Sequence, residues 1–68
     1  MSLQPHELRV VEEAHELKVR MDKLENFVHM NPAFDDLPEW DKALLAIQLE
    51  AMKTYNRVLV LRVSKFGG

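Results

Sequence analysis

Apolar residues in the first half of the chain repeat with the period of an α-helix. Between residues 10 and 28 their spacings alternate between four and three, the heptad pattern that gathers side chains into one stripe. Pro5 suits a first helical turn, and Pro32 disfavours helical geometry at the residue before it. The pattern therefore predicts a first helix over about residues 5–29. Its stripe consists of Val10, Ala14, Leu17, Met21, Leu24 and Val28.

A second helix is predicted over about residues 38–65. Pro38 suits a first helical position, and Glu39 and Asp41 follow in the turn where the helix dipole favours negative charge. Gly67 and Gly68 are expected to end this helix, because glycine readily adopts the backbone conformation found just after a helix.

The segment 30–37 is predicted to be the loop between the two helices. A connection of about eight residues favours antiparallel neighbours. Phe34 and Leu37 are expected to cover the end of the hairpin, with Trp40 packed beside the loop. The sequence thus predicts one all-α domain over residues 1–68, folded as an antiparallel two-helix hairpin.

The second predicted helix carries two apolar stripes on neighbouring faces. One partner helix covers only one of them, and residues 58–61 are apolar nearly all round, which indicates more than one neighbour. A chain of 68 residues without cysteine has neither a large core nor disulfides to stabilise it. We therefore expect a homo-oligomer built mainly through this helix. The stripes are Leu45, Leu49, Met52, Asn56, Leu59, Val63 and Phe66, and Leu44, Ile47, Ala51, Val58 and Leu61.

Charge is distributed unevenly along the chain. Residues 1–50 contain all 11 acidic residues and have a net charge of −6, whereas residues 51–68 contain four basic residues and no acidic one. This basic set is Lys53, Arg57, Arg62 and Lys65, which lack local carboxylate partners. Such a basic end attracts anionic groups, although a solvated charged face is the alternative. The overall charge of −2 disfavours duplex nucleic acid as a partner, whereas a small phosphate ligand needs far less charge.

Candidates for metal or catalytic chemistry are isolated from one another. Glu12 and His15 have the Glu-x-x-His spacing of di-metal helical bundles, but those need several such helices, and these two residues fit a solvated face. The three histidines are spread too far along one helix to converge. Asp35 and Asp36 fit a turn better than an acid–base pair. We therefore expect no enzyme, no catalytic residue, no metal and no other cofactor.

Two polar residues of the second helix have structural and functional interpretations. Asn56 lies on the first stripe, where a buried amide commonly fixes register and oligomeric state. Tyr55 suits burial in an interface, with contact to a ligand base as the alternative. No stretch approaches the roughly 18 apolar residues of a membrane span, and the first residues do not resemble a secretory signal. We expect a cytosolic protein with no membrane partner.

Six short motifs follow one another along residues 6–66. They are Arg9-Val10-Val11-x-Glu13, Glu16-Leu17, Leu24-x-x-Phe27-Val28, Phe34-x-x-Leu37-Pro38, Gln48-Leu49-x-x-Met52-x-x-Tyr55 and Val58-Leu59-x-x-Arg62-Val63. Each alone is an ordinary helix seam, so the specificity lies in their order, the Leu-Pro start of the second helix and the short length. This order resembles a family of very short bacteriophage proteins that includes the anti-CBASS cyclic-nucleotide sponges.

The resemblance implies a helical homohexamer in the cytoplasm of the host bacterium. It would sequester the cyclic di- and trinucleotide messengers of an antiphage system without hydrolysing them, so that the host effector is never switched on. A cyclic dinucleotide has nearly two-fold symmetry, which suits an isologous interface that offers each half the same groups.

The resemblance also implies four ligand-binding residues. His6 would stack on a base where the family often has an aromatic residue or a histidine, and Arg20 would pair with a phosphate of a dinucleotide. Arg62 would serve a separate site where three protomers meet around a trinucleotide, and Tyr55 would line either site or only the interface. The alternative to a ligand-binding function is a structural or adaptor role, in which the hairpin oligomerises and docks a protein partner.

Overall fold

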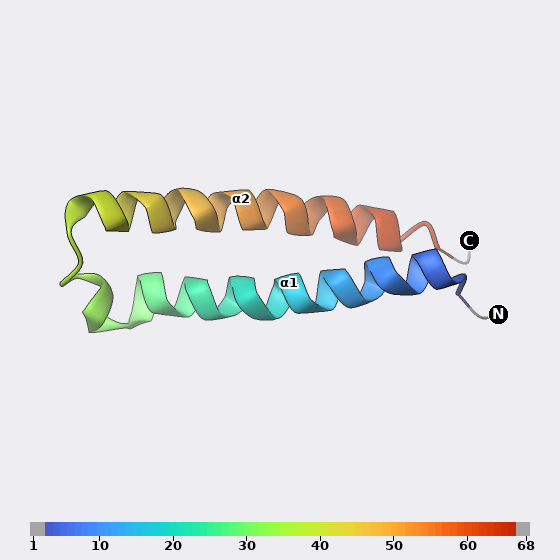
Figure 1. Ribbon diagram of the computed structural model, residues 1–68, viewed down its shortest axis with the longest axis horizontal. Coiled ribbons are helices and arrows are strands. Elements are labelled where there is room, and N and C mark those ends of the chain that lie inside the picture. Colours follow the sequence, from blue (N-terminus) through green and yellow to red (C-terminus); the bar gives the residue numbers. More distant parts are fainter. Residues whose placement is uncertain (1–2, 67–68) are drawn as a thin grey trace.

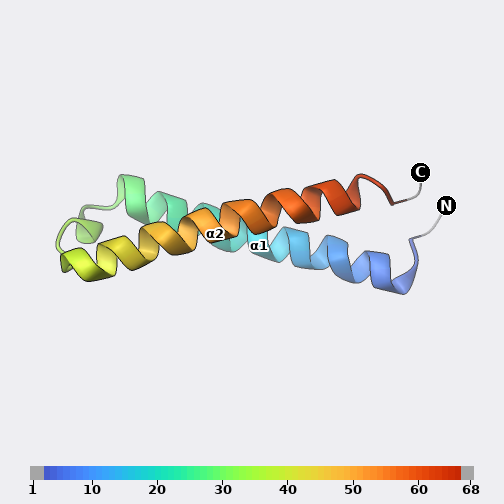
Figure 2. The ribbon, with the colours of Figure 1, turned by 90° about the horizontal axis from the view of Figure 1, so that it is seen from above.

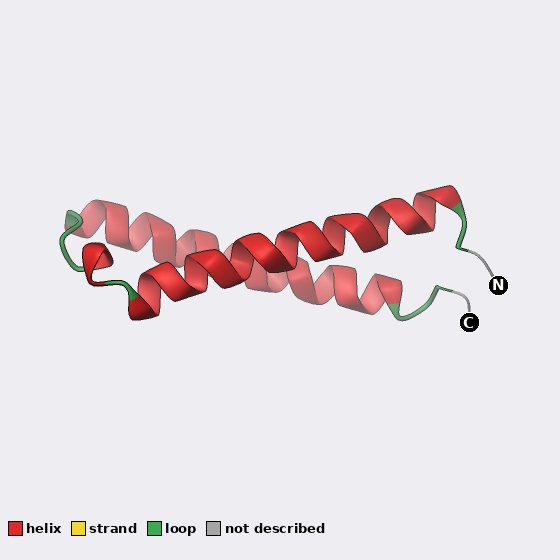
Figure 3. Ribbon diagram, turned by 90° about the horizontal axis from the view of Figure 1, so that it is seen from below, coloured by secondary structure: helices red, strands yellow, loops and turns green. Residues whose placement is uncertain are grey.

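The computed structural model describes residues 3–66 and contains two long helices joined by a short connection (Figure 1). The elements are α1 (Pro5–Met30), the 3-10 helix η1 (Pro32–Phe34) and α2 (Glu39–Val63). The long helices run antiparallel, so that α1 begins at the end of the molecule where α2 finishes, here called the open end. Residues 3–66 contain helices, turns and loops but no strand (Figure 3). The predicted all-α fold with two helices is confirmed for the single chain.

Local hydrogen bonds explain where α1 begins and ends. The backbone N–H of Gln4 donates to Oε1 of Glu7 at 2.8 Å, and Pro5 occupies the first helical position, where a missing N–H costs nothing. Asn31 ends the helix in an extended conformation because Pro32 follows it. The side-chain Oδ1 of Asn31 then accepts the N–H of Ala33 at 2.9 Å and so starts η1.

The connection is held against α1 by two aromatic rings. Phe27 and Phe34 meet edge to face, with ring centroids 5.9 Å apart and planes at 89°. Phe34 and Leu37 are half-buried, in keeping with their expected positions at the end of the hairpin. The prediction for Trp40 was wrong, because its side chain is 74% exposed. Trp40 precedes the buried Leu49 by nine residues, or about two and a half turns, so it lies on the opposite side of α2.

The ends of α2 are also defined by local bonds. The carbonyl of Pro38 accepts the N–H of Lys42 at 3.0 Å, which makes Pro38 the N-cap and Glu39 the first helical residue. After Val63 the chain continues in tighter turns, in which the N–H of Phe66 donates to the carbonyl of Val63 at 3.0 Å. Gly67 and Gly68, which were predicted to end the helix, lie outside the described residues.

The core is a thin seam between the two helices. It consists of Leu17 and Met21 from α1 and Leu49 and Leu59 from α2, the last with no exposed surface. Seen from above, the helices cross near their middles (Figure 2). The molecule measures 49 × 15 × 15 Å with a radius of gyration of 15.3 Å, whereas a compact chain of this length has about 11 Å. Its accessible surface is 5344 Å², against roughly 4,400 Å² for a compact monomer of this mass.

Much of the surplus surface lies on the side of α2 that faces away from α1. Trp40, Leu44, Ile47, Ala51, Val58 and Leu61 are all exposed there and, with the exposed Tyr55 at the edge, form what we call the outer α2 face. Ile47, near the middle of the helix, is 65% exposed. The second apolar stripe predicted from the sequence is therefore uncovered in the single chain.

Candidate ligand-binding site

One ion pair joins the two helices, and the others described lie within a helix. Nζ of Lys53 on α2 lies 3.0 Å from Oε2 of Glu25 on α1. The hydrogen bond that Lys53 donates to Glu25, and then the negative charge of Glu25, raise the pKa of Lys53 above its ordinary 10.5. Lys53 belongs to the basic set that lacks local carboxylate partners in the sequence, and the partner it has in the structure lies on the other helix. The partner is 28 residues away, so only the pairing of the helices reveals it.

Arg20 lies in the middle of α1 and is open to solvent. One of its guanidinium nitrogens lies 3.6 Å from Oε2 of Glu16, and the two side chains are 70% and 65% exposed. The distance is longer than a good hydrogen bond, and ion pairs this exposed contribute little. A ligand phosphate therefore has access to Arg20 if it displaces Glu16. Sequence reasoning did not identify Glu16 as this counter-ion, although the spacing of four residues on a helix indicates it.

Helix geometry places Arg20 and Tyr55 on the same side of the hairpin. Successive residues of a helix are turned by roughly 100° about its axis. Measured from the direction midway between the buried Leu17 and Met21, Glu25 lies about 60° to one side of α1 and Arg20 about 80° to the other. On α2, Lys53 and Tyr55 likewise lie about 80° to opposite sides. Since Glu25 and Lys53 meet on one side, Arg20 and Tyr55 share the other.

The two residues also lie at similar heights along the hairpin. Arg20 is five residues from Glu25 and Tyr55 two from Lys53, both toward the open end. At a rise of 1.5 Å per residue these offsets differ by only about 4–5 Å along the helix axes. Tyr55 is exposed, so its ring and hydroxyl are accessible beside the level of Arg20.

Arg62 and His6 lie closer to the open end. Arg62 follows Tyr55 by two helical turns and therefore lies on the same side of α2, about 10 Å nearer the open end. It is exposed and, within the described residues 3–66, has no carboxylate within salt-bridge distance. His6 is exposed in the first turn of α1, about 21 Å from Arg20 along that helix. One chain therefore does not bring His6 and Arg20 together.

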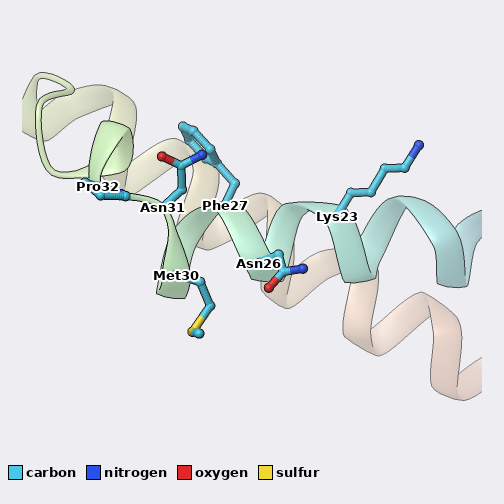
Figure 4. A pocket seen from close by; sticks show the side chains of 6 residues that line it. All are labelled: Lys23, Asn26, Phe27, Met30, Asn31 and Pro32. Carbon is cyan, nitrogen blue, oxygen red and sulfur yellow. The ribbon is translucent and has the colours of Figure 1, made fainter.

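A depression near the loop is unrelated to these four residues (Figure 4). It has a volume of about 590 Å³ and is lined by Lys23, Asn26, Phe27, Met30, Asn31 and Pro32. The side chain of Lys23 extends away from the others, and Met30 points to the opposite side of the helix from Phe27 and Asn31. Because its polar groups do not converge, the depression is not a formed ligand site.

The remaining sequence candidates are solvated or structural. Glu12 and His15 are exposed, and the described part of the chain contains no cluster of three His, Cys, Asp or Glu side chains arranged for a metal ion. Asn56 is half-buried on the side of α2 that faces α1. Neither helix of the described region is long and apolar enough to cross a membrane.

The fold and the site define a small α-helical hairpin protein with exposed arginines on one side and an uncovered apolar face on α2. Comparison with known protein families matches residues 4–65 to the family Sequestin. The match spans nearly the whole chain, and the protein therefore belongs to the Sequestin family, as the resemblance in its sequence had indicated. No curated protein and no solved structure matches the chain.

Proposed function

We propose that this protein is a phage-encoded sponge that binds cyclic di- and trinucleotide messengers in the cytoplasm of the host bacterium and holds them without cleavage. The family name Sequestin refers to sequestration, and the match over residues 4–65 is the observation that carries the proposal. Binding in a fixed ratio, with no turnover, lowers the free messenger concentration and leaves the host effector inactive.

The chemistry of the exposed side chains supports this ligand class. A cyclic dinucleotide presents two phosphates and two bases and needs cations and flat apolar groups around it. Arg20 and Tyr55 provide one of each on the same side of the hairpin, and Arg62 provides a second cation nearer the open end. His6 adds a ring in the first turn of α1. These four residues are the proposed ligand-binding set.

The proposal requires assembly, because a single chain does not enclose a ligand. The two helices form a rod 15 Å thick with its apolar outer α2 face in solvent. Association of copies through this face, in a hexamer, buries the apolar surface and brings single arginines from several protomers together. One arginine per protomer then becomes two at a two-fold site for dinucleotides and three at a three-fold site for trinucleotides.

Isothermal titration calorimetry of the purified protein against a panel of cyclic di- and trinucleotides tests the proposal. We expect heat of binding with at least one member, at a ratio below one ligand per protomer. The bound nucleotide, recovered after denaturation, should have its original mass. Absence of binding to every member contradicts the sponge function, and recovery of a linearised nucleotide indicates an enzyme.

The alternative is an oligomeric adaptor that docks a protein partner. The exposed apolar residues of α2 and the basic residues after Glu50 are also compatible with a protein interface. The adaptor predicts an oligomer in light scattering but no heat with any cyclic nucleotide. The same titration therefore separates the two functions.

A further inference from the structure

The outer α2 face is nearly palindromic about one small residue. Counted from Ala51, large side chains occur four, seven and eleven residues away in both directions along the helix. They are Ile47, Leu44 and Trp40 on one side and Tyr55, Val58 and Arg62 on the other, and all are exposed. Offsets of four, seven and eleven are the heptad spacings of a helix seam. The spacing of large side chains along this face is therefore the same in both directions from Ala51.

A seam of this kind fits a second copy of itself when the two helices run antiparallel. With a two-fold axis at Ala51, each residue faces the one at the same distance on the other side of Ala51 in the partner. Leu44 then meets Val58 of the partner subunit, and Ile47 meets Tyr55 of the partner subunit. The small side chain of Ala51 at the axis lets the two backbones approach closely, because the distance between packed helices depends on the side chains at the contact.

Charge selects the antiparallel direction over the parallel one. α2 has Glu39 and Asp41 in its first turn and Arg62 in its last, and Lys65 follows just beyond the helix. Parallel pairing places each charge beside its own copy, whereas antiparallel pairing places the basic end of each helix against the acidic start of the other. The ring of Trp40 then lies opposite the guanidinium of Arg62, a favourable cation–π pair.

We propose that two copies of this protein pair through α2 in an antiparallel, two-fold arrangement centred on Ala51. The inference rests on the self-association proposed above and does not depend on nucleotide binding. It gives one of the interfaces that a hexamer needs. It also places Arg62 at each edge of the seam, where a guanidinium stacked on an indole keeps its N–H donors free for a phosphate.

Disulfide trapping tests the position of the axis. The chain has no cysteine, so Ala51→Cys introduces a single thiol, and the exposed position leaves the hairpin core intact. Mild oxidation should convert most of the A51C protein into a covalent dimer that reductant reverses, because only a residue near the axis meets its own copy. Ala46→Cys, also exposed on α2 but turned about 140° from Ala51, is the matched control. Equal cross-linking of A51C and A46C contradicts the proposal.

Mixed cross-linking tests the direction of the partner helix. Leu44→Cys and Val58→Cys proteins, one carrying a mass tag, are mixed under reducing conditions and then oxidised. Antiparallel pairing predicts mainly L44C–V58C heterodimers in mass spectrometry and few homodimers of either variant. Homodimers of both with no heterodimer indicate a parallel pair and overturn the inference.

Charge reversal gives an independent measurement that needs no cysteine. Asp41→Arg and Arg62→Asp should each weaken self-association in sedimentation velocity, and the double variant should restore it toward the original state. In a parallel pair, each of the two positions faces its own copy. The double variant then still places like charges together, and self-association does not recover. Recovery in the absence of added nucleotide separates this result from any failure of ligand binding.

Discussion

The ammonium of Lys53 and the carboxylate of Glu25 lie 3.0 Å apart and form the one ion pair between the helices within residues 3–66. Both side chains are partly exposed, so their contribution depends on geometry more than on burial. The pair shows which side of α1 faces which side of α2 at this level. Arg20 and Tyr55 accordingly share the opposite side.

Glu25→Gln is expected to lower the midpoint of thermal unfolding. The change keeps the shape of the side chain but removes the charge that pairs with Lys53 across the hairpin. Asp22→Asn is the control, because Asp22 accepts from Lys18 within α1 at 2.8 Å and that exposed pair does not join the helices. Circular dichroism on heating measures both, and a larger loss for D22N contradicts a role of Glu25 in holding the helices together.

The contribution of this ion pair should disappear in alkaline solution. Because the folded-state pKa of Lys53 lies above the ordinary value of 10.5, its stabilisation is fully present below pH 10.5 and is lost as the pH rises through the folded pKa. Urea unfolding of the original protein and of E25Q should therefore differ at pH 8 and converge at strongly alkaline pH. A difference that persists after Lys53 has lost its proton assigns the effect of E25Q to another cause.

Leu59→Ala is expected to cost about 2–5 kcal/mol of unfolding free energy, because Leu59 is fully buried between the helices and the smaller side chain leaves a cavity. Leu61→Ala removes the same atoms two residues later, at a position that is 59% exposed in the single chain. Its effect should depend on protein concentration, since it acts through association. Urea denaturation at two protein concentrations separates the two behaviours. Similar, concentration-independent losses would falsify the separation between core and outer face.

Arg20→Ala and Arg62→Ala should affect different ligands. If Arg20 belongs to a dinucleotide site and Arg62 to a trinucleotide site, each variant weakens one ligand class and spares the other. Loss of a charged phosphate contact corresponds to roughly tenfold weaker binding or more. Calorimetry measures the affinities at a protein concentration where light scattering shows the oligomer intact, because Arg62 also lies at the edge of the proposed α2 seam. Equal losses for both ligands in both variants contradict the assignment of two sites.

Glu16→Gln is expected to strengthen dinucleotide binding by up to about fivefold. Glu16 lies 3.6 Å from Arg20, and a phosphate must displace this carboxylate, whose exposed pairing is worth at most about 1 kcal/mol. Glu12→Gln removes the same charge one helical turn earlier on α1 and serves as the control for general repulsion. If E12Q and E16Q raise the affinity equally, Glu16 acts only through net charge.

The candidate site was partly predictable because side chains on one helix have fixed relations. The accessibility of Arg20, its pairing with Glu16 and the position of Arg62 two turns after Tyr55 all follow from helical periodicity. The relation between Arg20 and Tyr55 did not follow, because it joins two helices and depends on how they are turned toward each other. The partner of Lys53 was missed for the same reason.

The sequence by itself determined the two helices, the turn between them and the presence of two apolar stripes on α2. These features depend on contacts within a few residues: the caps at Gln4 and Asn31, the prolines, and the 3.6-residue repeat. Only the tertiary structure decided which stripe of α2 packs against α1, and so left Trp40, Ile47 and Leu61 in solvent. That choice depends on the packing of Leu49 and Leu59 against α1 and on the Glu25–Lys53 pair, and these are contacts between residues far apart in the chain.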